Sequence, residues 1–434
     1  MLISDPGQEE KTSSGLVPYT VRCDSCGFTL IDSAYRATCP RCDGSLTFDY
    51  PASQSLSAIP ALDESGMWKY RNRLPVSPQV VPVSLGEGQT PLLRARGAQP
   101  YDLYLKNEAV SPTGSHKDRS LSVAITKAVE HGFTACMLYS DGSAALSSAA
   151  YAARAGLLNI AVVPAGTHES RLYPLAVYNS AIVEFAGTSA QALNWVHETC
   201  LELGLYETST YRQANPYGSE GIKTISYEIF AQLGAVPDWL AVTVGGGGTL
   251  AGIWRGFLEL RALGLTQSLP RLIGVLPCGY RVMEIARRHG AASFSELCKL
   301  ADFPLAETAQ VKIAMEHPPD GIEAIQAIRD SGGHFAFATD EEAWAAQAQL
   351  GARDGIYAEV SATGPLAAIE QLETRSAFRP GDVVVAVITG SGFRETAATV
   401  SPIPIHLEKV DRATGIQSLK SILKGITTCP TGAK

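Results

Sequence analysis

One lysine stands where a turn of small residues runs into a segment with helical spacing. The turn and its continuation read PTGSHKDR, in which the lysine is Lys117. Residues 101–106 before the turn alternate like a strand, and apolar residues recur at helical spacing after it. An enzyme would keep a lysine that forms a Schiff base at such a junction. The alternative is a lysine on a solvated helix face, because most lysines lie in water.

A second candidate site is a run of four glycines. The apolar residues 241–244 lead into this run, and a segment with helical spacing follows it. The resulting glycine loop consists of Gly245, Gly246, Gly247, Gly248 and Thr249. Free backbone N–H groups and the helix dipole would converge there, which suits a phosphate group. The run matches neither the spaced dinucleotide motif nor a P-loop, and a tight turn is the alternative.

A loop with two hydroxyl groups provides the third element. The apolar run at residues 383–388 ends in TGSG, so that Thr389 or Ser391 lies at the carboxyl end of a strand. A junction lysine together with a phosphate loop suggests pyridoxal phosphate, held covalently at one end and by its phosphate at the other. A neutral hydroxyl at the pyridine nitrogen favours chemistry at the β and γ carbons over transamination. The alternatives are an ordinary glycine turn for TGSG and simple packing, in place of a phosphate contact, for His116.

Four cysteines near the N-terminus carry an independent signal. They form two C-x2-C pairs, which are Cys23 with Cys26 and Cys39 with Cys42. This spacing is typical of a zinc ribbon, in which four thiolates surround one tetrahedral ion. Such a site is structural, because four protein ligands leave no open position for chemistry. The alternatives are a pair of disulfides and a ribbon that has lost its metal.

Composition limits the classes of protein that fit. The chain has 434 residues, of which 45% are hydrophobic, and a net charge of −8. This charge argues against nucleic acid and against an anionic membrane surface as partners. The first 15 residues are polar and we find no apolar run of membrane-spanning length, which predicts a cytoplasmic protein.

Short apolar runs alternate with helix-length segments through most of the chain. This alternation predicts an α/β fold with two parallel-sheet domains, and ligands bind beyond the carboxyl ends of such strands. We expect a cofactor between the domains, where both glycine-containing loops would lie. The expected parts are a disordered N-terminus at 1–20, a zinc ribbon at 21–50, a large domain at 51–124 and 226–400 with an N-terminal arm at 51–90, a small domain at 125–225 and a C-terminal extension at 401–434.

Several separate motifs share one family resemblance. From about residue 20 to residue 400 the chain resembles the threonine synthases of the fold type II pyridoxal-phosphate enzymes, in the tryptophan synthase β superfamily. The motifs that carry the resemblance occur in the family's order and are GMWKYR at 66–71, LGEGQTPL at 85–92, PTGSHKDR at 112–119, YAARAG at 151–156, NPY at 215–217, EGIKT at 220–224 and TGSG at 389–392.

The resemblance implies a role for each candidate residue. Lys117 would carry the cofactor and later move the Cα proton of the substrate, while the glycine loop and His116 would hold the cofactor phosphate. Thr389 would face the pyridine nitrogen, and Ser143 stands where the family has an Asn that contacts the phenolic oxygen. The loop that would bind the substrate carboxylate consists of Ser140, Asp141, Gly142, Ser143 and Ala144. Family members are commonly homodimers.

Four positions depart from the family pattern. Ser143 and Ala144 replace an Asn and a Thr, Asp141 adds a negative charge beside a carboxylate site, and Gly218 replaces an Arg near the substrate phosphate. Arg171 could restore a positive charge. We expect threonine synthesis from O-phosphohomoserine. The alternatives are β-replacement on serine or phosphoserine as in cysteate synthase, dehydration of threonine or serine, and a catalytically silent relative.

Overall fold

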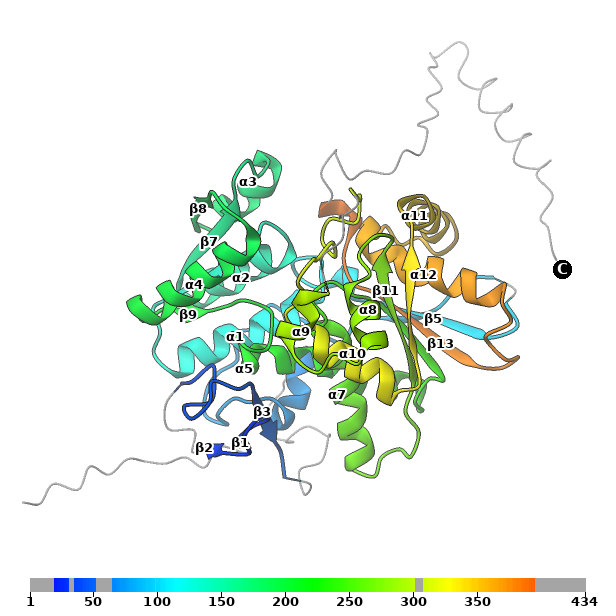
Figure 1. Cartoon of the computed structure of the whole chain (residues 1–434), viewed down its shortest axis with the longest axis horizontal. Helices are drawn as coiled ribbons and strands as arrows, with labels where there is room; N and C mark the ends of the chain where they lie inside the picture. Colours follow the sequence, from blue (N-terminus) through cyan, green and yellow to red (C-terminus); the bar gives the residue numbers. More distant parts are fainter. Residues whose placement is uncertain (1–18, 31–34, 52–64, 98, 301–306, 395–434) are drawn as a thin grey trace, which may run out of the picture.

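The computed structural model describes residues 19–30, 35–51, 65–97, 99–300 and 307–394. Its strands form three sheets, a small one near the N-terminus and two larger ones that lie side by side (Figure 1). The predicted C-terminal extension at 401–434 falls outside the described residues, as does the predicted disordered N-terminus apart from its last two residues. Of those two, Tyr19 is buried and Thr20 begins the first strand.

The large sheet has six strands in the order β12-β11-β10-β13-β5-β4. All neighbouring pairs are parallel except the edge strand β4, which runs antiparallel to β5. Strand β10 is buried along its whole length, as expected for a parallel strand covered on both faces. The strands are β4 (Leu92–Arg94), β5 (Asp102–Asn107), β10 (Trp239–Thr243), β11 (Arg271–Pro277), β12 (His334–Ala338) and β13 (Val383–Ile388).

Helices cover both faces of the large sheet. On one face α12 packs against β10, β11 and β13, and α11 packs on α12. On the other face α7 contacts β10 and α10 contacts β11. The helices of this half are α6 (Thr224–Leu233), α7 (Gly248–Ala262), α8 (Val282–His289), α9 (Phe294–Lys299), α10 (Gly321–Asp330), α11 (Asp340–Asp354) and α12 (Val360–Glu373).

The second large sheet has four strands, all parallel, in the order β8-β7-β6-β9. Helix α4 packs against β6, and α2 packs against β7 and α1. The strands are β6 (Ala135–Tyr139), β7 (Leu158–Pro164), β8 (Ala181–Phe185) and β9 (Tyr206–Glu207). The helices are α1 (Lys117–Glu130), α2 (Ser143–Ala155), α3 (Glu169–Val177), α4 (Ser189–Leu203) and α5 (Pro216–Ser219). The predicted α/β class with two parallel sheets is confirmed, although the exact domain boundaries stay a prediction.

The N-terminal ribbon is a three-stranded antiparallel sheet in the order β2-β1-β3. Its strands are β1 (Thr20–Cys23), β2 (Thr29–Leu30) and β3 (Leu46–Asp49). The ribbon packs on α1 and α5: the ring centroids of Phe48 and Tyr217 are 4.9 Å apart, and the buried Lys127 donates to the Tyr19 hydroxyl at 2.7 Å. Short 3-10 helices occur at η1 (Gly66–Arg73), η2 (Glu108–Val110), η3 (Glu220–Lys223) and η4 (Gly392–Arg394).

The sheet order brings three loops to one edge. Strands β10, β13 and β5 are neighbours and run parallel, so their carboxyl ends meet. The glycine loop follows β10, TGSG follows β13, and the lysine turn (residues 111–116) follows β5 by way of η2. Ligands of parallel α/β sheets bind at this edge. Among the described helices, none is long and apolar enough to cross a membrane.

Candidate active site

Lys117 is the first residue of α1, at the meeting of the two parallel sheets. It is partly buried, and its Nζ donates to the Thr210 hydroxyl at 3.1 Å. Thr210 follows β9 of the four-stranded sheet, whereas the lysine turn follows β5 of the six-stranded sheet. Burial lowers the pKa of Lys117 to about 8, and the nearby Asp320 carboxylate acts in the opposite direction. The amine is therefore far more often unprotonated near neutral pH than an ordinary lysine.

Asp118 fixes the turn in front of the lysine. It is fully buried and accepts hydrogen bonds from the backbone N–H of Thr113 at 2.7 Å and from the Ser147 hydroxyl at 2.7 Å. Because Thr113 lies in the lysine turn and Ser147 in α2, this carboxylate joins the turn to the helix that carries the candidate substrate loop. Burial raises the pKa of Asp118.

Arg119 anchors the same end of α1 in the interior. Its guanidinium has no exposed surface and pairs with Glu108 at 2.8 Å and with Glu228 at 2.7 Å, and Lys106 shares Glu228 at 2.7 Å. Burial would raise the pKa of Glu228, but the two cations bring it down to about 2. Two cations and two carboxylates thus balance each other. Removal of any one of them would leave a buried charge unpaired and lower the stability of the fold.

The glycine loop lies against Asp320 just before α10. The backbone N–H of Asp320 donates to the Gly246 carbonyl at 2.8 Å. Gly247 has φ of 99°, and a Cβ there would lie 2.5 Å from the Asp320 carbonyl oxygen. A Cβ on Gly248 would collide with the Asp320 carboxylate. Two of the four glycines are therefore required by close approach.

This loop fits a phosphate group. Helix α7 begins at Gly248, and within the described residues no side-chain cap bonds to its first backbone N–H groups, which leaves them available to an anion. The neighbouring Asp320 carboxylate would oppose a phosphate when it is charged. Burial raises the pKa of Asp320 to about 7, which weakens that opposition near neutral pH.

His116 joins the glycine loop to TGSG. Its Nδ1 lies 3.0 Å from the Thr389 carbonyl oxygen and its Nε2 lies 3.0 Å from the Thr249 hydroxyl. A carbonyl can only accept, so Nδ1 carries the hydrogen and Nε2 accepts from Thr249. Burial lowers the pKa of His116 to about 3, so the ring is neutral. His116 therefore makes two directed hydrogen bonds, which is more than the simple packing that the sequence left as an alternative to a phosphate contact.

Thr389 and Ser391 both lie beside the lysine turn. Each is buried, and the Ser391 backbone N–H donates to the Gly114 carbonyl at 2.9 Å. The His116 backbone N–H donates to the Thr389 carbonyl at 3.1 Å. The structure thus brings the lysine, the glycine loop and TGSG to one place, while the roles of individual residues toward a cofactor stay a prediction.

The candidate substrate loop, residues 140–144, joins β6 to α2 and is partly exposed throughout. Asp141 forms an ion pair with Arg171 of α3, so its charge is offset. This pair removes the repulsion that an isolated Asp141 would exert on a carboxylate. The Ser143 hydroxyl accepts from Arg394 at 3.0 Å.

Gly218 lies in α5 and packs closely against α1. A Cβ at this position would lie 2.7 Å from the Asn215 amide nitrogen and 3.0 Å from the Ser120 carbonyl oxygen. No larger side chain fits without a shift of backbone. A cation for the substrate must therefore come from another position.

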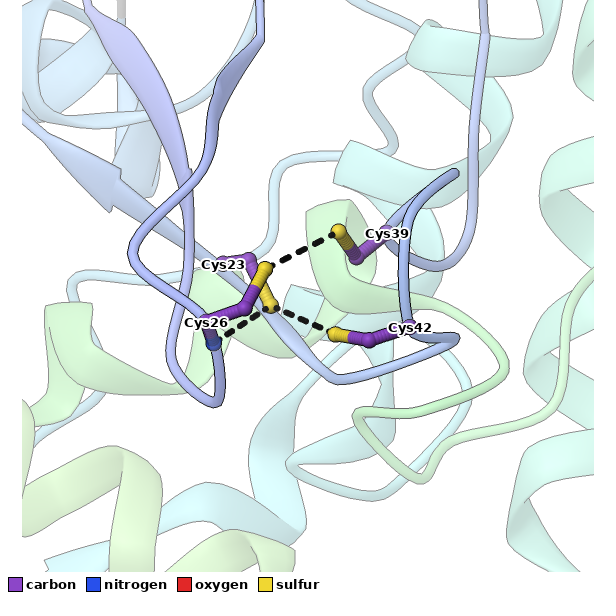
Figure 2. A group of neighbouring side chains, drawn as sticks. All are labelled: Cys23, Cys26, Cys39 and Cys42. Atoms are coloured by element: carbon purple, nitrogen blue, oxygen red, sulfur yellow. Dashed lines mark hydrogen bonds between the residues drawn. The ribbon is translucent and has the colours of Figure 1, made fainter.

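The four cysteines of the ribbon converge on one point (Figure 2). The sulfur atoms of Cys23 and Cys42 lie 3.5 Å apart, and those of Cys26 and Cys39 lie 3.7 Å apart. Zinc–sulfur bonds of about 2.3 Å in a tetrahedron require sulfur atoms roughly 3.8 Å apart. Backbone N–H groups of Cys26 and Arg41 point at these sulfurs at 3.5 and 3.4 Å. The geometry fits one tetrahedral ion.

Arg212 connects this ribbon to the cofactor site. Its guanidinium, almost fully buried, forms an ion pair with Asp24 of the first cysteine knuckle and donates to the Leu46 carbonyl at 2.8 Å. Its backbone N–H donates to the Asp320 carboxylate at 2.9 Å. The ribbon therefore contacts, through one residue, the segment that supports the glycine loop.

Four residues of the site were not found from the sequence. Asp118 and Arg119 follow the lysine directly in PTGSHKDR, and their place in that motif was an available signal. Thr210 and Asp320 lie in loops without any motif, and only the packing of distant segments brings them to the lysine and the glycine loop.

A partly buried lysine between two α/β sheets is an arrangement that enzymes use to hold pyridoxal phosphate between two domains. A family model described as "Pyridoxal-phosphate dependent enzyme" matches residues 83–390. A threonine synthase of Methanocaldococcus jannaschii is 32% identical over 93% of this chain and 99% of its own length. One of Methanosarcina acetivorans is 32% identical over 88% of this chain and 94% of its own.

Solved structures agree on the fold. A pyridoxal 5'-phosphate-dependent aspartate racemase superposes with a TM-score of 0.60 at 19% identity, over 73% of this chain and 93% of its own. Threonine deaminase isoform 2 of Solanum lycopersicum gives a TM-score of 0.58 at 18% identity, over 70% and 83%. The chain belongs to the pyridoxal-phosphate-dependent enzyme family of fold type II, in which it is a threonine synthase-like lyase.

The low pKa of Lys117 leads to a prediction about cofactor uptake. Only an unprotonated amine can form a Schiff base. If Lys117 attaches the cofactor, the rate of uptake by cofactor-free protein should therefore rise about tenfold per pH unit and level off near pH 8. Stopped-flow absorbance after mixing with pyridoxal phosphate measures this rate. A rate that continues to rise beyond pH 10 would show an amine of ordinary pKa and contradict the prediction.

Proposed function

We propose that this enzyme catalyses elimination or replacement at the β or γ carbon of a small amino acid, with threonine formation from O-phosphohomoserine as the first choice. The observation that carries the proposal is the Lys117 amine, with a pKa of about 8, held 3.1 Å from Thr210 at the common edge of two sheets. The relatives named threonine synthase, at 32% identity over 93% of the chain, support the choice of substrate.

Each predicted residue has a place in this proposal. Lys117 would bind pyridoxal phosphate covalently, and the uncapped N–H groups of the glycine loop would hold its phosphate. His116 would support this loop through its hydrogen bond with the Thr249 hydroxyl. Thr389 would face the pyridine nitrogen, and Ser143 would lie near the phenolic oxygen. When bound, the cofactor supplies an electron sink that stabilises negative charge at the substrate Cα.

Lys117 would then act as the base. Once the substrate amine has replaced it, its unprotonated Nζ takes the proton from Cα, and the Thr210 hydroxyl keeps the amine in position between transfers. In threonine formation Cβ also loses a proton, the γ C–O bond breaks and releases phosphate, and Cγ gains a proton to become a methyl group. One water molecule then adds its hydroxyl to Cβ while a proton returns to Cα. The protein would hold the proposed substrate loop, residues 140–144, near this amine.

One observation favours the second candidate function. Gly218, which packs against the Ser120 carbonyl, excludes the cation that threonine synthases hold near the substrate phosphate. β-Replacement on serine would not need that cation, because serine carries no phosphate; O-phosphoserine, the other donor of this candidate function, as in cysteate synthase, is not favoured by this observation. Dehydration of threonine or serine is a third candidate.

We also propose a structural zinc ion at Cys23, Cys26, Cys39 and Cys42 and a homodimeric assembly. The sulfur–sulfur distances of 3.5 and 3.7 Å support the zinc. The family resemblance alone supports the dimer. Metal analysis of the purified protein and sedimentation equilibrium test the two statements separately.

Product analysis decides among the candidate reactions. The cofactor-loaded enzyme is incubated separately with O-phosphohomoserine, O-phosphoserine, serine and threonine, and phosphate, ammonia and amino-acid products are measured. Phosphate and threonine from O-phosphohomoserine support the first choice. Phosphate from O-phosphoserine alone would reject the first choice in favour of chemistry at the β carbon of that substrate, and ammonia from threonine or serine would point to dehydration.

A further inference from the structure

Arg394 lies at the centre of the site although no motif contains it. It ends η4, two residues after TGSG, and its two terminal nitrogens reach different parts of the protein. One donates to the hydroxyl of Ser143, the first residue of α2, at 3.0 Å, and the other donates to the Glu359 carboxylate at 3.0 Å. The guanidinium therefore bridges the edge of the large sheet and the candidate substrate loop.

Arg394 shares its acidic partner with a second cation. The same Glu359 oxygen that accepts from Arg394 also accepts from Lys312, so that one carboxylate faces two cations. Glu359 is itself buried, and its backbone N–H donates to the Gly390 carbonyl at 3.0 Å, which fixes the carboxylate beside TGSG. Arg394 therefore does not hold this carboxylate alone.

Arg394 also has a donor that the protein does not use. Its Nε is buried and makes no hydrogen bond within the described part of the chain. A Cβ on Gly114 would lie 3.1 Å from this Nε, so the side chain crosses directly over the lysine turn. A buried donor without a partner costs free energy unless a ligand or water satisfies it.

The start of α2, beside Arg394, is also favourable for an anion. Gly142 precedes this helix and no side chain caps its first N–H groups. Asp141, the nearest acid on the loop, is paired with Arg171 and does not cancel the helix dipole. The uncapped N–H groups can bind one carboxylate, and Arg394 then remains for a second anionic group.

We infer that Arg394 is a substrate-binding residue that receives an anionic group on the substrate side chain, so that the enzyme selects amino acids with a second anion. This inference rests on the proposed function, because it concerns the substrate of that same site. It supplies the cation that Gly218 cannot carry. A phosphate ester and a carboxylate share the required chemistry, and a guanidinium binds either through two parallel hydrogen bonds.

Binding to the cofactor-loaded enzyme, followed as a change in cofactor absorbance, tests the inference without turnover. Two pairs of ligands differ in side-chain charge: O-phosphoserine with serine, and aspartate with asparagine. In at least one pair we expect the wild type to bind the anionic member about tenfold more tightly or better. The pair that shows the preference identifies phosphate or carboxylate as the group bound.

Variants at one position separate recognition from folding. Arg394→Gln should abolish the preference and leave the affinity for serine or asparagine within about threefold, whereas Arg394→Lys should keep part of it. Arg329→Gln, an exposed arginine of α10, is the matched control and should bind as the wild type does.

Two results would overturn the inference. One is a wild type without any preference for the anionic ligand, and the other is Arg394→Gln weakening charged and neutral ligands equally. A wild type that prefers the anionic ligands but turns over none of the proposed substrates would contradict the proposed function and still support the role of Arg394.

Discussion

Replacement of Lys117 by alanine should remove covalent cofactor binding and lower kcat by roughly 10³-fold or more. The size of the effect follows from two duties of one amine, which attaches the cofactor and also moves the Cα proton. No described side chain other than Thr210 is hydrogen-bonded to this amine, and a threonine cannot replace a base. The absorbance spectrum before and after borohydride and the steady-state rate of product formation measure both effects.

Two further variants define the control for this experiment. Lys117→Arg keeps a positive charge at the start of α1 but cannot attach the cofactor, so it should be as inactive as alanine. Lys299→Ala removes an exposed lysine of α9 and should leave spectrum and rate unchanged. A Lys117→Ala protein that keeps a borohydride-sensitive band would place the attachment at another lysine.

Replacement of Cys39 by serine should abolish binding of the proposed zinc ion and lower the apparent melting temperature by on the order of 10 °C. Cys39 is fully buried, and its sulfur lies 3.7 Å from that of Cys26. Serine is a poor zinc ligand, so the remaining three sulfurs would be left as unpaired thiolates in a small sheet with little core of its own. Metal content and thermal unfolding measure the two effects.

The same variant should also weaken cofactor binding. Asp24 and the Leu46 carbonyl of the ribbon hold the Arg212 guanidinium, and the Arg212 backbone holds Asp320 beside the glycine loop. Loss of the ribbon would therefore loosen the support of the phosphate site. Equilibrium binding of pyridoxal phosphate measures this effect, and Cys278→Ser, outside the ribbon, is the control. A Cys39→Ser protein with full metal content and unchanged stability would contradict the zinc proposal.

Features encoded in short segments could be predicted from the sequence. The lysine turn, the four glycines and TGSG are each local patterns, and the rule that parallel strands share a carboxyl edge was enough to bring them together. In the structure His116, which precedes Lys117, contacts both Thr249 and Thr389, because β5, β10 and β13 are neighbours in the sheet. The cysteine spacing likewise predicted convergence of four sulfurs.

Contacts between distant segments could not be predicted in the same way. Asp141 and Arg171 were both recognised from the sequence, but the ion pair between them depends on how α3 packs against the loop. Gly218 stood out as a missing cation, and only the packing of α5 on α1 shows that no side chain fits there. Arg394 carries no motif at all, and its contact with Ser143 spans 251 positions of the chain.

Reduction of the loaded enzyme with borohydride, followed by trypsin and mass spectrometry, tests the central claim most directly. A modified Lys117 resists cleavage, so the cofactor should appear on one uncut peptide of residues 107–119. That result would establish Lys117 as the cofactor lysine and support every role built on it. A cofactor found on Lys106, Lys312 or any other lysine, with residues 107–117 released unmodified, would contradict the account.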